Sequence, residues 1–68
     1  MDSSKEKLID DIIYETNEKL SFIAQEMKDI KFSNLDDNTK ESKIRVLREE
    51  FQKMLDEQQK RILEITKQ

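Results

Sequence analysis

The sequence predicts an all-α protein, an antiparallel two-helix hairpin that resembles a coiled coil. Three observations lead to this prediction. Glycine and proline, which disfavour helices most, are absent from the 68 residues. Apolar residues recur at alternating spacings of three and four in two long segments, which is the period of one helix face. Between these segments lies the one stretch dense in Ser, Asn and Asp, residues that are typical of turns.

The first helix is predicted at about residues 4–31. Ser3 and Glu6 have the spacing of a capping box, in which a hydroxyl and a carboxylate satisfy free amides at a helix start. The apolar stripe that follows contains Ile9, Ile13, Thr16, Leu20, Ile23, Met27 and Ile30.

The polar segment at about residues 32–38 is predicted to be the turn. Without glycine, Asn34 is the best candidate for a left-handed residue that ends the first helix. Asn38, with Glu41 three residues later, is predicted to cap the start of the second helix.

The second helix is predicted at about residues 39–66. Its stripe consists of Ile44, Leu47, Phe51, Met54, Leu55, Gln58, Ile62 and Ile65. Several of these residues are eleven positions apart, a step that relaxes the left-handed supercoil of a seven-residue repeat. We therefore expect locally straight packing near Met54 and Leu55.

The position of the fold-back point favours a hairpin over one continuous helix. When the chain folds back about Asp37, stripe residues pair at equal distances from it, with Ile12 in place of Ile13. A continuous rod would instead bury polar residues of the turn segment, at a cost in stability. Two alternatives stay open, the rod and a chain that remains disordered until a partner binds.

The same pairing places Thr16 opposite Gln58. We interpret these two residues as a polar layer that sets the register of the helices. The alternative is that Gln58 lies at the edge of the stripe and reaches solvent.

Two helices bury only one side of each stripe, which does not offset the entropy lost on ordering the chain. We therefore predict that one domain of residues 1–68 dimerises into a four-helix bundle, or docks on the helices of another protein. Neighbours such as Leu8, Ile12, Ala24 and Leu55 would help to close the bundle core. The predicted interface comprises Ile13, Leu20, Ile23, Met27, Leu47, Phe51, Met54, Leu55 and Ile62.

Tyr14 and Phe22 fall far from the first stripe, as Val46 and Leu63 do from the second. Exposed aromatic residues are enriched at binding hot spots, so Tyr14 and Phe22 are candidate partner anchors. The alternative is that they are ordinary exposed apolar residues or are covered in a bundle.

The charge pattern disfavours nucleic acid and membrane surfaces as partners. Thirteen Lys and Arg against sixteen Asp and Glu give a net charge of −3. Lys40, Lys43, Arg45 and Arg48 are the densest basic group, and an RNA- or DNA-binding hairpin would have to use them. No apolar run could span a bilayer, and the first residues are acidic and polar, so we expect an intracellular protein, cytoplasmic or nuclear.

No candidate catalytic, cofactor or metal site emerges from the residue types. Cysteine and histidine are absent, and paired carboxylates such as Asp36 and Asp37 are helix neighbours that point about 100° apart. We expect a non-enzymatic structural or interaction protein without a small-molecule substrate, whose partner is a second copy or a helical protein. The alternative is a small acidic regulator or inhibitor that blocks a larger protein with the carboxylates of Asp10, Asp11 and Glu15.

Overall fold

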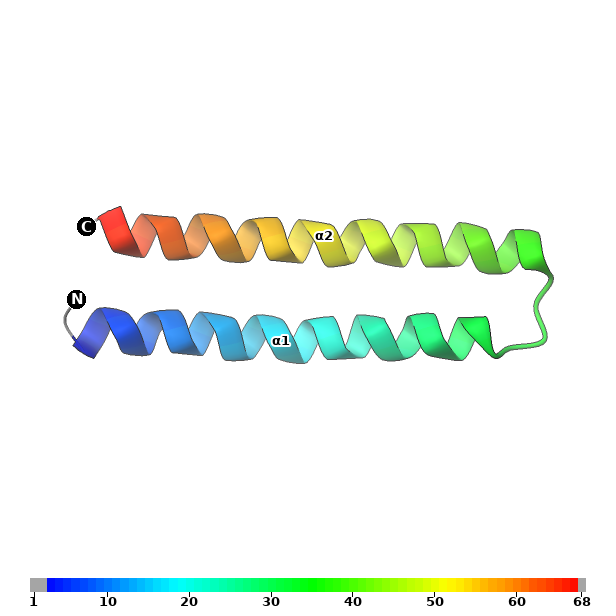
Figure 1. Cartoon of the computed structure of the whole chain (residues 1–68), viewed down its shortest axis with the longest axis horizontal. Helices are drawn as coiled ribbons and strands as arrows, with labels where there is room; N and C mark the ends of the chain where they lie inside the picture. Colours follow the sequence, from blue (N-terminus) through cyan, green and yellow to red (C-terminus); the bar gives the residue numbers. More distant parts are fainter. Residues whose placement is uncertain (1–2, 68) are drawn as a thin grey trace.

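The computed structural model describes residues 3–67, and over this range it consists of two helices and a short turn. Helix α1 spans Ser3–Lys31, and helix α2 spans Asp37–Lys67. The two helices lie side by side and antiparallel, so residues 3 and 67 lie at the same end of the molecule (Figure 1). The prediction of an all-α antiparallel hairpin is therefore confirmed, and the continuous rod is excluded.

The end of α1 differs from the prediction. The left-handed residue predicted at Asn34 is wrong, because no described non-glycine residue has a positive φ. Ser33 ends the helix instead. Its backbone amide and its hydroxyl donate to the carbonyl of Ile30, at 3.2 Å and 2.6 Å respectively. The serine side chain thus satisfies a terminal carbonyl without an unusual backbone conformation.

The prediction that Asn38 caps helix α2 is wrong, because Asp36 is the cap. The Asp36 carboxylate accepts a hydrogen bond of 2.7 Å from the Thr39 amide, and Asn38 lies inside the helix. The backbone hydrogen bond from Thr39 is the main cause that holds the pKa of Asp36 below its ordinary value of 3.8. Hydrogen bonds to the charged carboxylate favour that form.

Lys40 ties the two helices together beside the turn. Its Nζ donates a 3.0 Å hydrogen bond to the carbonyl of Lys31, the last residue of α1. A cation that binds a terminal carbonyl also interacts favourably with the negative end of the helix dipole.

The hairpin interior is a row of side chains between the helices, which we call the seam. Only Ile12, Thr16 and Ile23 are buried among the described residues, with 5%, 8% and 5% exposure, and none of these lies in α2. The stripes predicted from the sequence meet here, with Ile12 in place of Ile13. The half-buried members of the seam are Ile9, Leu20, Met27, Ile30, Ile44, Leu47, Phe51, Met54, Leu55, Gln58, Ile62 and Ile65.

The hairpin is a thin slab that exposes much of its surface. Its extents are 51 × 16 × 9 Å, and its accessible area is 5593 Å². A compact protein of 8.2 kDa would expose about 4,500 Å². Only two apolar residues, Ile12 and Ile23, are buried in the described part of the hairpin, and two broad faces stay open.

Candidate interaction surface

The two broad faces of the hairpin are distinguished by the residues that flank the seam. On α1, the residue before a seam residue and the residue after it lie on opposite sides, since neighbours on a helix are about 100° apart. Glu15 precedes Thr16, whereas Ala24 follows Ile23. The contrast is clearest in the middle of the hairpin, where Glu15, Lys19 and Arg61 flank the seam on one side and Ile13 and Ala24 flank it on the other. We call these sides the charged face and the apolar face.

The charged face consists of Glu15, Lys19, Glu26, Lys43, Glu57 and Arg61. Glu15 bridges the helices there, 3.7 Å from Arg61 and 3.8 Å from Lys19. These side chains are more than half exposed, so each pair contributes less than about 1 kcal/mol. Their main effect is to place charged, solvated groups along this side of the seam.

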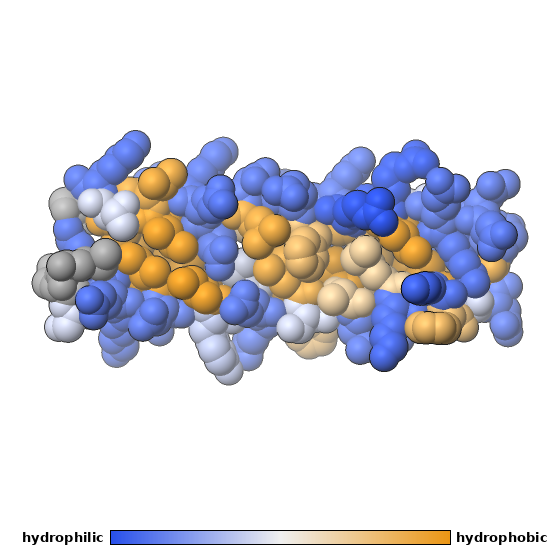
Figure 2. Space-filling model, viewed as in Figure 1, coloured by the Kyte–Doolittle hydropathy of each residue, from blue (hydrophilic) through white to orange (hydrophobic). Residues whose placement is uncertain are grey.

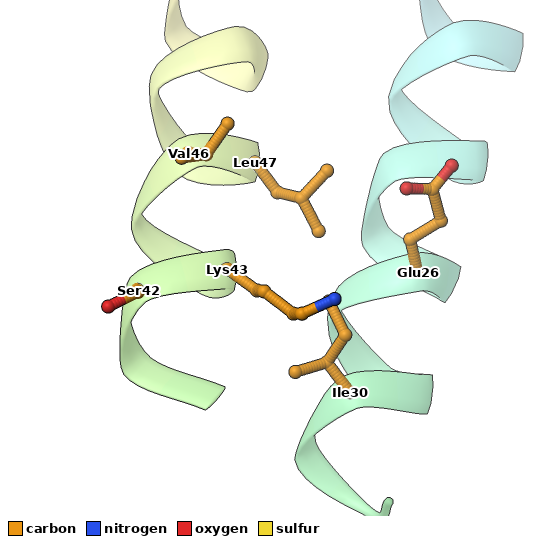
Figure 3. A pocket seen from close by; sticks show the side chains of 6 residues that line it. All are labelled: Glu26, Ile30, Ser42, Lys43, Val46 and Leu47. Atoms are coloured by element: carbon orange, nitrogen blue, oxygen red, sulfur yellow. The ribbon is translucent and has the colours of Figure 1, made fainter. Parts of the chain in front are cut away.

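Long polar side chains shield the apolar seam on the charged face. Near the turn, an open hollow of about 410 Å³ is lined by residues of both helices. In Figure 3, Lys43 extends from α2 toward α1, Leu47 also points toward α1, and Ser42 points away. Lysine can cover apolar surface with its aliphatic stem while its ammonium group stays in water.

The apolar face consists of Ile13, Leu20, Ala24, Met27, Phe51, Leu55 and Ile62. Ala24, Met27, Arg48 and Phe51 line an open hollow of about 370 Å³ on this side. Ile13 lies three helical turns before Ala24 on the same line of α1 and is 37% exposed. Figure 2 shows a band of apolar side chains between the helices along most of their length.

Among the predicted interface residues, Ile13 lies on the apolar face outside the seam. Leu20, Met27, Phe51, Leu55 and Ile62 are half-buried seam residues that also form part of this face. Ile23 is buried between the helices, whereas Leu47 and Met54 line hollows on the charged side. Arg48, at the rim of the apolar hollow, is a residue that the apolar spacing alone does not identify.

The structure brings Thr16 and Gln58 together. Thr16 is 8% exposed, Gln58 is half-buried, and both line one small hollow beside Glu15 and Arg61. No buried side-chain nitrogen or oxygen in residues 3–67 lacks a hydrogen-bond partner. The polar layer therefore borders the charged face, and its role in setting register stays a prediction.

The candidate anchors Tyr14 and Phe22 project away from the seam. Both are strongly exposed, and Phe22 lines an open hollow with Glu18, Ser21 and Gln25. A role for them in partner binding stays a prediction.

The structure does not gather the basic residues of the second helix into one patch. Lys40 binds the carbonyl of Lys31, and Lys43 lies on the charged face. Arg45 and Arg48 line a hollow with Glu41 and Ile44 on the other side of α2. A nucleic acid would therefore meet these cations on separate surfaces.

Within residues 3–67 there is no cluster of three or more side chains suited to hold a metal ion. Neither helix over this range combines the length and the apolar character that a membrane crossing requires. Comparison of the chain with protein-family models, with curated proteins and with solved structures finds no match.

Proposed function

We propose that this protein is a non-enzymatic interaction protein that acts by burying its apolar face against other helices. The observation that supports this most is the contrast between the two faces. In the middle of the hairpin, the seam is flanked by the charged Glu15, Lys19 and Arg61 on one side and by Ile13 and Ala24 on the other. A monomeric hairpin would gain nothing from that asymmetry, whereas a bundle buries one face and solvates the other.

Self-association into a four-helix bundle is the simplest form of this function. Sedimentation equilibrium at micromolar concentration tests it, with Leu55→Asp as the disruptive variant. The matched control is Val46→Asp, because Val46 is 54% exposed and lines the hollow on the charged face.

We expect wild type and Val46→Asp to associate and Leu55→Asp to be monomeric and poorly folded. A buried unpaired carboxylate is costly, whereas an exposed one is not. If Leu55→Asp associates as wild type does, the apolar face is not the binding surface.

A second candidate function is that of an acidic regulator, favoured by the outer side of α1. Phe22 is 73% exposed there beside Glu18, so an aromatic anchor and a carboxylate are available together to a basic partner. Reversing Asp11 and Glu18 to lysine tests this candidate in pull-downs over a range of salt concentrations. Binding that survives both the substitutions and high salt would rule it out.

A further inference from the structure

The charges that border the apolar face are unevenly distributed along α1. Glu6 and Asp10 lie in its first third, and Lys28 and Lys31 lie in its last turn. Each is three, four or seven residues from Ile13 or Ala24, spacings that keep side chains on one side of a helix. These four residues take no part in the two ion pairs found within the described hairpin.

We propose that a second copy of this chain covers the apolar face, packed face to face with its long axis reversed. This inference rests on the interaction function proposed above. The twofold axis would lie in the interface, perpendicular to the helices. It would cross α1 at the level of Glu18 and Lys19. It would place Glu6 level with Lys31 of the second copy and Asp10 within one residue of its Lys28, so opposite charges meet at both ends.

The same axis matches large side chains with small ones. Ile13 and Ala24 are equidistant from the axis, so the exposed Ile13 of each copy lies over Ala24 of the other. There it would enter the hollow of about 370 Å³ between Met27, Arg48 and Phe51. A large side chain that fills a hole beside a small one is the packing expected between bundle helices. On α2, Leu55 lies beside the axis and meets Leu55 of the second copy.

The size of the face fits a dimer interface. The broad face measures 51 × 16 Å between Cα extremes. A second hairpin has the same length and width, so it covers this face from end to end.

Packing with parallel long axes is disfavoured by charge. In that arrangement α1 would lie on α2 of the second copy, and Lys28 would come level with Arg45 and Arg48. Repulsion between like charges disfavours a packing arrangement even where attraction between exposed opposite charges contributes little free energy. Ala24 would then lie near Arg48 of the second copy, about 16 Å from Ile13 of that copy, given the rise of a helix.

Single cysteines distinguish the two arrangements, because the chain has no cysteine of its own. One copy of the 68-residue chain carries Ala24→Cys, and the other carries either Ile13→Cys or Arg48→Cys. Each mixed pair is oxidised gently. A disulfide forms only when the Cα atoms approach within about 7 Å. We expect the Ala24 and Ile13 variants to cross-link and the Ala24 and Arg48 variants not to.

The outcomes separate this inference from the proposed function. Cross-linking of Ala24→Cys to Arg48→Cys in a dimer overturns the reversed packing but leaves self-association intact. A dimer that forms neither cross-link also overturns it. A chain that is monomeric by sedimentation equilibrium at all concentrations overturns both proposals.

Charge reversal provides a second test that does not depend on oxidation. Lys28→Glu with Lys31→Glu is expected to weaken dimerisation on the order of tenfold, since two attractions per α1 become repulsions. Mixing with a Glu6→Lys and Asp10→Lys chain should restore association as a heterodimer. Lys53→Glu with Lys60→Glu, on the outer side of α2, is the control with the same change in net charge. Equal weakening by the control, or no rescue, would contradict the reversed arrangement.

Discussion

Asp36 shows how one exposed side chain decides where a helix begins. Its carboxylate binds the Thr39 amide at 2.7 Å, and α2 starts at the following residue. Asparagine is also a good N-cap, whereas alanine cannot accept the amide. We predict that Asp36→Ala lowers the melting temperature by a few degrees and that Asp36→Asn leaves it nearly unchanged at neutral pH. Circular dichroism at matched concentrations measures both, and equal melting of Ala and Asn variants would argue against the cap.

The same cap gives a defined dependence on pH. The pKa of Asp36 is lower in the folded protein than its ordinary value of 3.8, mainly through the amide of Thr39. The contribution of the charge is therefore complete above the unfolded pKa and is lost as the pH falls through the folded one. When the pH is lowered from neutral to below 3.8, the melting temperature of wild type should therefore fall more than that of Asp36→Asn.

Thr16 and Gln58 are polar residues in the seam, and their cost in stability can be tested. Polar groups in a bundle interior are retained at the expense of stability when they select one arrangement. We predict that the double variant Thr16→Val, Gln58→Leu melts at a higher temperature than wild type. We also expect it to be less selective in the cysteine cross-linking assay. A lower melting temperature would mean that the two side chains contribute net stability where they are.

On α1, the side of the helix on which a residue lies decides whether it contributes to folding or to association. The residue type does not decide this. Ile12 and Ile13 are adjacent and chemically identical, yet they are 5% and 37% exposed. We predict that Ile12→Ala costs about 2 to 5 kcal/mol and unfolds the hairpin, because it leaves a cavity in the seam. Ile13→Ala should lower the association constant with little loss of helicity in the dimer that remains.

This pair of variants serves as its own control, since the same atoms are removed one residue apart. Sedimentation equilibrium reports association, and circular dichroism at saturating concentration reports folding. Indistinguishable behaviour of the two variants would mean that the seam does not separate the faces as described.

The helices and their pairing could be predicted from the sequence because both depend on spacing. Apolar residues three and four apart determine a face, and the polar segment around Asp37 determines where the chain turns back. The caps could not be predicted as well. Several side chains in the turn segment could cap a helix end, namely Ser33, Asn34, Asp36 and Asn38. Which of them does so depends on the backbone geometry of the turn, which is set only when the turn forms. Either Ile12 or Ile13 also satisfies the spacing of the stripe.

The two faces of the whole molecule could be separated from the sequence in part. The apolar spacing identifies which residues lie inward, but it is symmetric about the seam. The signal that breaks the symmetry is the identity of the flanking residues, such as Glu15 on one side and Ala24 on the other. Spacing alone does not carry that signal, and the antiparallel arrangement of the two helices is needed to bring equivalent flanks onto one face.

Concentration should control the stability of the whole molecule if the apolar face is buried in a dimer. Because only three of the described residues are buried, folding and association are expected to occur together, and dilution favours the unfolded chain by mass action. A tenfold dilution should lower the melting temperature by roughly 5 °C, from the entropy of unfolding two chains and the free energy of a tenfold change in concentration. Melting followed by circular dichroism from micromolar to millimolar concentration tests this. The Val46→Asp control should follow the same slope, whereas a melting temperature independent of concentration would show that the hairpin is stable by itself.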